Sequence, residues 1–120
     1  MKQYSEEHQW VEIAGGLATV GVSAFAAGEL GEVTFVELPH VGQLVRKGEP
    51  LCVVESMKAA ADLTAPISGK IVEVNSVLER NPSFLNQSPE ADGWLCRLAG
   101  VREDELASLM GKKAYEAFLG

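Results

Sequence analysis

Short runs of apolar residues, many of them β-branched, recur along most of the chain with glycine or proline between them. The runs Trp10–Ile13 and Leu17–Val22 flank Gly15 and Gly16, which predicts two strands joined by a tight hairpin turn. Further strands are expected at Val33–Leu38, Leu51–Glu55, Ala60–Thr64, Lys70–Val74 and Trp94–Leu98. Strands this short, at this spacing, predict a mainly β fold, either a sandwich or a flattened barrel.

Helical patterns are few and short. Ser23 has the chemistry of a helix N-cap, and Gly31 that of a helix end, so a helix is expected over Ala24–Leu30. A helical turn is expected over 81–85. At about 103–119 apolar residues return at helical spacing, which predicts one or two amphipathic helices. Their apolar stripe is expected to cover an open side of the β core, with binding of a partner as the alternative.

Length and charge limit the range of functions. The 120 residues allow one domain, 1–120, with the β core at about 9–98 and the helical segment at about 103–119. With 17 acidic and 10 basic residues, the net charge of −7 disfavours nucleic acid and anionic membranes as partners. The longest uncharged run, Ile13–Gly28, is too short to cross a bilayer, and no apolar stretch of a secretory signal begins the chain. An intracellular protein is expected.

Residue types that carry catalytic or metal chemistry are sparse. Cys52 and Cys96 lie in separate apolar runs, so both are expected to be reduced core residues. Two cysteines and two histidines at scattered positions do not form a metal-ligand pattern. The sequence therefore predicts no metal site, and it shows no catalytic triad or phosphate-binding loop.

One lysine has an unusual setting. Met57 and Lys58 occupy the expected tip of the hairpin between Leu51–Glu55 and Ala60–Thr64. A single lysine at a turn is usually only a solvated charge. Here, however, the small neighbour Ala59 leaves room for an enzyme, and a rigid turn presents the amine at low entropic cost. This setting suits a lysine that an enzyme grips and acylates.

The residues around this lysine also carry a family resemblance. Glu55–Ala59, with Ala65–Gly69 and Val72–Asn75 behind it, resembles the attachment-site signature of the biotinyl/lipoyl carrier domains. Within that superfamily the chain most resembles the glycine cleavage H-protein family. The other segments that match the family are Tyr4-Ser5, His8–Trp10, Val20–Ser23, Leu30-Gly31, Phe35–Pro39, Val41-Gly42, Asp92–Trp94 and Glu105–Tyr115.

The resemblance implies a flattened, barrel-like sandwich of two short antiparallel sheets, with short peripheral and C-terminal helices and lipoic acid in amide linkage to Lys58. It implies a non-catalytic carrier that moves the aminomethyl group of glycine from a pyridoxal-phosphate-dependent glycine dehydrogenase to a tetrahydrofolate-dependent aminomethyltransferase. The other implied partners are dihydrolipoamide dehydrogenase, which reoxidises the lipoyl group, and the lipoyl ligase or transferase that attaches it. The implied state is a monomer in the bacterial cytoplasm, or in the mitochondrial matrix for a processed eukaryotic chain.

The chain departs from the family pattern at three positions, where Gln9 replaces the usual glutamate, Glu90 a common aromatic residue and Met57 a common valine. A glutamine offers the loaded arm only a neutral hydrogen bond, so contacts with the arm are expected from Asp62 or Glu7 as well as Gln9. The alternatives are an exposed strand residue for Gln9 and a solvated hairpin charge for Asp62.

Three other functions remain open. Biotin carriers typically have methionine on both sides of the modified lysine, and here Met57 precedes Lys58 while Ala59 follows it. A lipoyl carrier is therefore the preferred interpretation, and a biotin carrier of a carboxylase is the first alternative. The others are an H-like lipoyl-relay protein outside glycine cleavage and a scaffold module whose lysine stays unmodified. His8 and Trp10 are expected to serve packing and hydrogen bonding.

Overall fold

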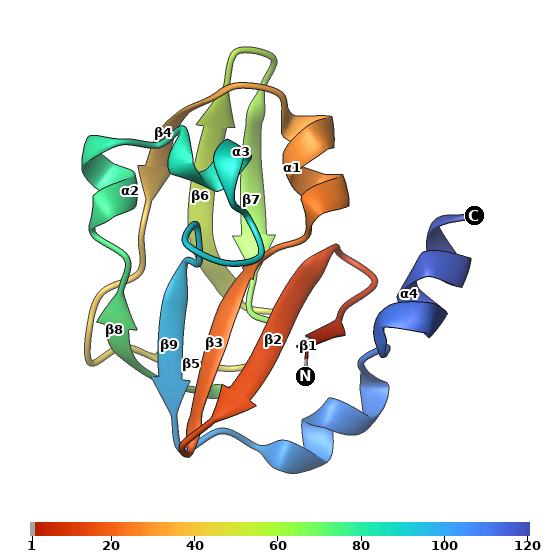
Figure 1. The fold of residues 1–120 in the computed structure, drawn as a ribbon. Coiled ribbons are helices and arrows are strands. Elements are labelled where there is room, and N and C mark those ends of the chain that lie inside the picture. The colour runs from red at the N-terminus through yellow and green to blue at the C-terminus, as the bar shows by residue number, and fades with distance from the viewer. Residues whose placement is uncertain (1) are drawn as a thin grey trace.

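The larger of two antiparallel sheets is built around the hairpin predicted at the glycine pair (Figure 1). The computed structural model describes residues 2–120; Met1 lies outside the described residues. Gly15 and Gly16 have φ angles of +59° and +79°, a conformation that glycine adopts readily. The strand order is β1-β2-β3-β9-β8-β5. These strands are β1 (Lys2–Tyr4), β2 (Gln9–Ala14), β3 (Leu17–Val22), β9 (Cys96–Ala99), β8 (Gly69–Val74) and β5 (Leu44–Val45).

The smaller sheet has the order β4-β6-β7 and supplies the second layer. Its strands are β4 (Val33–Glu37), β6 (Pro50–Ser56) and β7 (Ala60–Thr64). Val20 and Ile71 of the larger sheet belong to the same buried core as Val36 and Val54 of the smaller one. Within residues 2–120, neither sheet closes into a barrel, and the chain measures 37 × 37 × 22 Å. The predicted mainly β, flattened sandwich of two antiparallel sheets is confirmed.

Three short helices border the small sheet. They are α1 (Ala24–Leu30), α2 (Val77–Arg80) and α3 (Phe84–Gln87). The prediction of α1 is confirmed, and the Ser23 hydroxyl accepts a hydrogen bond from the Ala26 N–H at 3.1 Å. The helical turn expected over 81–85 is confirmed, since the N–H groups of Phe84 and Leu85 donate to the carbonyls of Asn81 and Pro82, each at 3.1 Å, and the turn continues into α3. Helix α2 just before it was not predicted, and Asn81 and Pro82 separate the two helices. Proline disfavours a helical residue before it, and Asn81 leaves the helix with φ −141° and ψ 76°.

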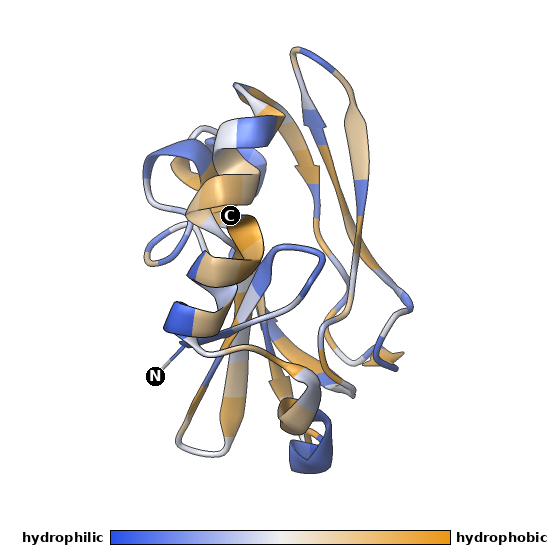
Figure 2. Cartoon of the chain, turned by 90° about the vertical axis from the view of Figure 1, so that its right-hand side faces the viewer, coloured by the Kyte–Doolittle hydropathy of each residue, from blue (hydrophilic) through white to orange (hydrophobic). Residues whose placement is uncertain are grey.

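The C-terminal segment covers one side of the β core, as predicted (Figure 2). Its elements are the 3-10 helix η1 (Glu103–Ser108) and α4 (Lys112–Leu119). Leu106 and Leu109 pack against the main core, and Tyr115 stacks on Tyr4 with 4.5 Å between ring centroids. Phe118 departs from the expected stripe, since it is 48% exposed.

Strands β1 and β5 were not predicted, and β9 begins two residues later than expected. The polar sequence of β1 gives no strand signal, yet this strand pairs with β2 through Lys2↔Glu12 and Tyr4↔Trp10. Strand β9 starts at Cys96 rather than Trp94, because the Asn75 amide donates hydrogen bonds of 2.9 Å to the carbonyls of Asp92 and Trp94 and holds them in a loop. The sheet thus extends from Lys2 to Ala99, beyond the expected core of 9–98.

Both cysteines are free and buried, which confirms their expected place in the core. No helix within residues 2–120 combines the length and apolar character of a membrane span.

Candidate functional site

Lys58 lies at the tip of the β6–β7 hairpin, whose turn extends beyond the paired strands of the smaller sheet (Figures 1 and 2). The last strand pair is Glu55↔Ala60, and the Ser56 N–H then donates to the Ala59 carbonyl at 2.9 Å. Both residues at the tip are exposed, Met57 at 73%. The predicted position of Lys58 at a tight turn is confirmed.

A single side chain shapes this turn. The Ser56 hydroxyl donates to the Ala59 carbonyl at 3.1 Å. It also accepts hydrogen bonds from the backbone N–H groups of Lys58 at 3.2 Å and Ala59 at 3.3 Å. A hydroxyl that binds its own turn in this way restricts the backbone. The direction in which Lys58 leaves the hairpin is therefore defined.

The segment that follows α1 supports the hairpin tip. The Met57 N–H donates to the Glu32 carbonyl at 3.0 Å. Beside it, Gly31 has a φ of +73°, and a Cβ atom at this position would lie 3.3 Å from Cε of Lys58. The lysine stem therefore lies against the Gly31 backbone, and a side chain at this position would require the stem to shift.

Asn86 of α3 holds this supporting segment in place. Its amide Nδ2 donates to the Gly31 carbonyl at 2.7 Å, and its Oδ1 accepts from the Val33 N–H at 2.9 Å. From the sequence, Gly31 could be identified only as a helix end, and Glu32 and Asn86 could not be identified. These contacts join residues that are far apart in the chain, so no local sequence pattern predicts them.

A groove of about 230 Å³ lies between α1 and β7, and Leu30 in its wall adjoins Gly31, which the Lys58 stem contacts. Its lining residues are Glu7, His8, Val22, Phe25, Ala26, Glu29, Leu30, Ala61 and Leu63. Leu30 adjoins Gly31 at the end nearest the lysine, and α1 leads from there to His8 at the other end. The walls are mostly apolar, with carboxylates at Glu7 and Glu29.

The three predicted arm contacts lie in different places. Glu7 lines the groove, and its Oε2 accepts a hydrogen bond of 2.7 Å from the Thr64 hydroxyl. Gln9 is only 3% exposed and accepts a 2.7 Å hydrogen bond from Ser5, so the alternative of an exposed strand residue is wrong. Gln9 lines a neighbouring cavity of about 360 Å³ that Glu7 also borders.

Asp62 is exposed and lies on the other face of β7. Side chains alternate along a strand, so Ala61 and Leu63 point into the groove while Asp62 points away from it. It lines a separate depression of about 280 Å³. Of the three predicted contacts, the structure brings only Glu7 to the groove beside Lys58.

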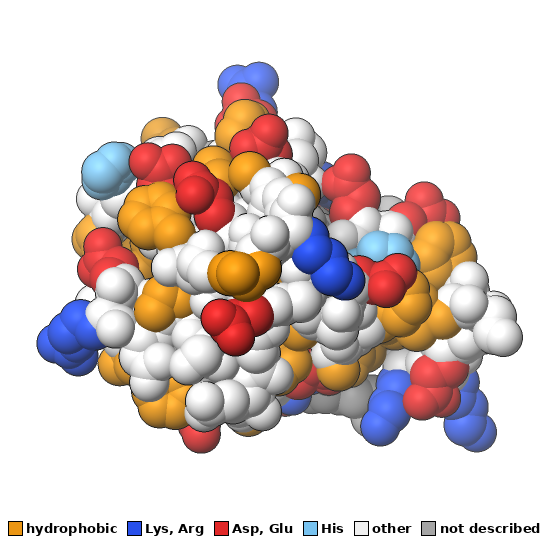
Figure 3. Space-filling model, turned by 90° about the horizontal axis from the view of Figure 1, so that it is seen from above, with side chains coloured by type: hydrophobic (Ala, Val, Ile, Leu, Met, Phe, Trp, Pro, Cys, Tyr) orange, Lys and Arg blue, Asp and Glu red, His pale blue; other side chains and the backbone are white. Residues whose placement is uncertain are grey.

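The face that carries the hairpin tip is rich in acidic side chains (Figure 3). Glu29 and Glu32 lie at the end of α1 and just beyond it, and Glu55 lies in β6, all of them exposed. Lys58 therefore projects from an acidic face of the molecule. Acylation of Lys58 would remove a positive charge from this face.

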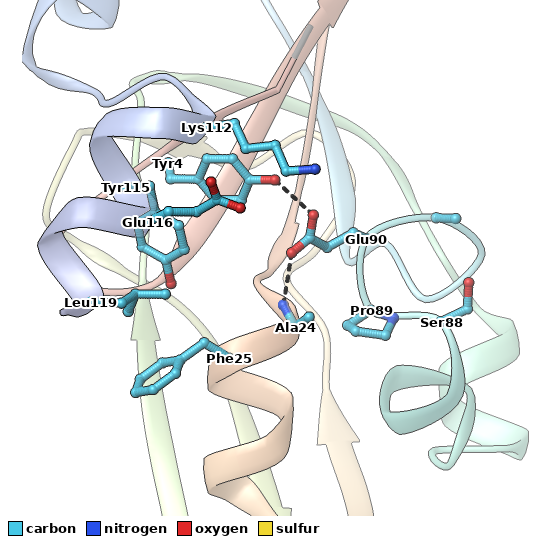
Figure 4. A pocket seen from close by; sticks show the side chains of 11 residues that line it. Tyr4, Ala24, Phe25, Ser88, Pro89, Glu90, Lys112, Tyr115, Glu116 and Leu119 are labelled. Atoms are coloured by element: carbon cyan, nitrogen blue, oxygen red, sulfur yellow. Dashed lines mark hydrogen bonds between the residues drawn. The ribbon is translucent and has the colours of Figure 1, made fainter.

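The third departure from the family, Glu90, lies at a separate cavity of about 520 Å³ beneath α4 (Figure 4). Its Oε1 accepts a 2.7 Å hydrogen bond from the Tyr4 hydroxyl, and its Oε2 accepts one of 2.8 Å from the Ala24 N–H. Burial, reinforced by the Glu90 carboxylate, raises the pKa of Tyr4 above its ordinary value, so the hydroxyl remains a donor. Glu90 therefore fastens the start of α1 to β1.

The cavities hold no activated thiol and no metal ligand set among residues 2–120. Burial raises the pKa of the Cys96 thiol to about 12, and it raises that of Cys52 as well. Neither thiol ionises near neutral pH. No group of three or more His, Cys, Asp or Glu side chains in the described part of the chain is arranged to hold a metal ion.

An exposed lysine on a rigid hairpin, an apolar groove beside it and a two-sheet sandwich form the arrangement that the resemblance implies. The family model described as "Glycine cleavage H-protein" matches residues 2–120. The chain belongs to this family. It is therefore the carrier component of the glycine cleavage system, and nothing in the comparisons favours a biotin carrier.

Individual relatives agree with this assignment. The chain is 47% identical over 118 residues to a glycine cleavage system H protein of Caulobacter vibrioides, covering 98% of each chain. It is 48% identical over 118 residues to one of Thermotoga maritima, covering 98% of this chain and 95% of that one. A mitochondrial H protein of Flaveria trinervia is 47% identical over 116 residues, which cover 97% of this chain and 70% of the relative.

A solved structure also shares the fold. The crystal structure of a glycine cleavage system H protein from Mycobacterium marinum superposes with a TM-score of 0.85 at 35% sequence identity. The match covers 97% of this chain and 94% of that one.

Proposed function

We propose that Lys58 is the residue that carries the lipoyl group, in amide linkage to its Nζ. The position of this lysine supports the proposal most directly, because the amine is exposed on a turn that Ser56 holds in shape. An amine presented in this way is accessible to a lipoyl ligase or transferase. The absence of a side chain at Gly31 leaves room for the lysine stem beside the tip.

We further propose that the chain delivers an aminomethyl group from the pyridoxal-phosphate-dependent glycine dehydrogenase to the tetrahydrofolate-dependent aminomethyltransferase. Dihydrolipoamide dehydrogenase then restores the oxidised form. When bound, the lipoyl group supplies a disulfide that accepts the cargo and a dithiol that is later reoxidised. The chain itself acts as a monomeric carrier without catalytic residues, in the cytoplasm of a bacterium or the matrix of a mitochondrion.

The groove beside Lys58 fits an arm of this kind. Its apolar walls from α1 and β7 would exclude water from an aliphatic chain, and its Leu30 end adjoins Gly31, which the lysine stem contacts. The amine of the cargo is cationic near neutral pH, and the Glu7 carboxylate lies in the groove wall. We therefore assign shelter of the loaded arm to this groove, with Glu7 as the acidic contact.

Gln9 and Asp62 remain proposed contacts of the loaded arm. Gln9 would meet an arm that passes Glu7 into the neighbouring cavity, and Asp62 one that crosses to the outer face of β7. Decay of the cargo adduct on isolated Asp62→Asn, Gln9→Glu and Glu7→Gln proteins separates these paths. Asp62→Asn is expected to shorten the lifetime and Gln9→Glu to lengthen it; identical decay in every variant would contradict shelter at all three positions.

A modification assay tests the attachment site and the cofactor together. Native protein and Lys58→Arg are incubated with a lipoyl ligase, ATP and lipoate, and separately with a biotin ligase and biotin, and intact masses are measured. Arginine keeps the charge but is not a substrate for the ligase. The native chain is expected to gain one lipoyl group, Lys58→Arg none, and the control Lys70→Arg one. Lipoylation of Lys58→Arg would refute the site, and a biotin mass on the native chain would favour the alternative carrier.

Transfer is tested with the lipoylated protein. Glycine dehydrogenase is expected to release carbon dioxide from glycine when lipoylated native protein is present, and not with Lys58→Arg. Equal release with both proteins would contradict the proposed role.

A further inference from the structure

His8 has an unusual backbone at the end of the groove farthest from Lys58. Its φ of +69° is the only positive value among the non-glycine residues that the structure describes. The His8 N–H donates to the Ser5 carbonyl at 3.0 Å, and the His8 carbonyl accepts from the Ser23 N–H at 2.9 Å. Such a conformation is costly for a residue with a side chain and is retained where its surroundings hold it. The backbone at His8 is therefore held in one conformation.

A chain of hydrogen bonds leads from His8 into the core. The His8 Nδ1 lies 2.8 Å from the Tyr115 hydroxyl oxygen, and that oxygen lies 2.7 Å from Oγ of Ser23. The Ser23 oxygen also accepts the N–H of Ala26 at 3.1 Å. Three segments that are distant in sequence, the turn at His8, the cap of α1 and the C-terminal α4, thus meet through side-chain polar atoms.

The direction of each proton along this chain follows from the donors and acceptors present. Ser23 is fully buried, and within residues 2–120 the only acceptor for its hydroxyl proton is the Tyr115 oxygen. Tyr115 must then donate its own proton to His8 Nδ1. A ring nitrogen that accepts a hydrogen bond carries no proton, so in the neutral imidazole the proton lies on Nε2. The opposite direction would leave the buried Ser23 proton without a partner, at an energetic cost.

The second ring nitrogen of His8, Nε2, is available to bind a ligand in the groove. It makes no hydrogen bond within residues 2–120, and His8 lines the groove wall. The rings of Phe25 at 4.8 Å and Phe118 at 6.0 Å border the imidazole. The carboxylates of the same wall, Glu7 and Glu29, accept hydrogen bonds, whereas an Nε2–H group donates one. His8 would therefore bind an acceptor, and the carboxylates a donor or a cation.

We propose that Ser23 and Tyr115 fix the tautomer of His8 so that its Nε2–H donates a hydrogen bond to the sulfur atoms at the end of the lipoyl arm. His8 is then a positioning residue, and the carboxylates of the groove receive the cationic cargo. The inference rests on the proposed attachment of the arm to Lys58. It assigns the end of the arm rather than its amide to His8, because the amide lies near Lys58 and His8 lies at the far end of α1.

The tautomer is tested on the unmodified protein by nitrogen-15 NMR of the imidazoles. His40 is exposed, and its ring makes no hydrogen bond within residues 2–120, so it serves as the internal reference for a mixture of tautomers. Above the pH at which both rings lose their charge, His8 is expected to show an unprotonated Nδ1 and a protonated Nε2. In Tyr115→Phe, which keeps the ring that stacks on Tyr4, His8 is expected to approach the mixture seen for His40. A protonated Nδ1 in the native protein would overturn the inference, whether or not the variant folds.

The contact with the arm is tested on the lipoylated, reduced protein by titration of the arm thiols. A neutral donor favours the thiolate, so the native protein is expected to form thiolate at a pH about 0.5–1 unit lower than His8→Phe. His8→Gln, which offers an amide N–H, is expected to restore most of this shift. Equal titration of all three proteins would overturn the positioning role. Failure of Lys58 to gain a lipoyl group would instead refute the proposed attachment, while the tautomer measurement would still decide the first half of the inference.

Discussion

Replacement of Gly31 by alanine tests how the backbone after α1 supports Lys58. Gly31 has φ +73° and ψ −160°, a region that is essentially restricted to glycine, and a side chain forced into it costs about 1–3 kcal/mol. The added Cβ would also lie 3.3 Å from Cε of Lys58. The lysine stem is flexible and yields, so the contact adds little to the loss of stability. It does move the amine away from its present position.

Gly28→Ala, three positions earlier and within α1, is the matched control. A Cβ at Gly28 meets nothing within 4 Å, and its φ is not positive. Alanine in place of a helical glycine stabilises by about 0.5–1 kcal/mol. The two substitutions are therefore expected to differ in sign, with free energies of unfolding about 1.5–4 kcal/mol apart.

Urea unfolding followed by circular dichroism measures both effects, and ligase assays give the rate of lipoylation of each folded variant. Gly31→Ala is expected to unfold at lower urea and to be lipoylated more slowly than the native chain. Gly28→Ala is expected to unfold at higher urea and to be lipoylated at the native rate. A Gly31→Ala protein as stable as Gly28→Ala would refute the reasoning about the backbone, and an unchanged rate of lipoylation would refute the role of Gly31 in placing the lysine.

Three further predictions concern the hairpin support and the core. Asn86→Ala leaves two backbone groups without their side-chain partners and is expected to lower the free energy of unfolding by about 1–3 kcal/mol. The control Asn81→Ala, at an exposed position, is expected to lower it by about 0.5 kcal/mol or less. Equal urea midpoints for the two variants would contradict this. Exchange of Met57 and Lys58 keeps composition and charge but changes the direction of the amine. Ligase assays are therefore expected to show about a tenfold or larger drop in the rate of lipoylation. Modification at the native rate would mean that the ligase does not recognise the geometry of the turn. Because burial raises the pKa of the Cys96 thiol to about 12, neither cysteine is expected to react with a thiol reagent at pH 8 until urea unfolds the chain, and rapid labelling of folded protein would show that the thiols are accessible.

The elements that could be predicted are those with a strong local signal. The hairpin at Gly15 and Gly16, the capped helix α1 and the turn at Lys58 each depend on residues adjacent in sequence. Strand β1 gives no such signal, because its residues are mostly polar and only Tyr4 is buried. It becomes a strand because β2 offers an edge to pair with.

The candidate site also has a part that could be predicted from the sequence and a part that could not. Lys58 could be identified from its turn and its family signature, whereas its support comes from residues that the fold brings together. Asn86 reaches Gly31 across 55 positions, and Tyr115 reaches His8 across 107. Asp62 and Glu7 carry the same charge, and only the fold shows which of them faces the groove. Glu7 lines it, whereas the alternation of side chains along β7 turns Asp62 to the other face.

Mapping of the modification on protein purified from its native source tests the central claim most directly. Protease digestion and peptide mass spectrometry assign any added group to one lysine. A lipoyl mass is expected on the peptide that contains Lys58 and on no other lysine of the chain. A chain that carries its lipoyl group on a different lysine, or a biotinyl group on Lys58, would contradict the claim that Lys58 is the lipoyl attachment site.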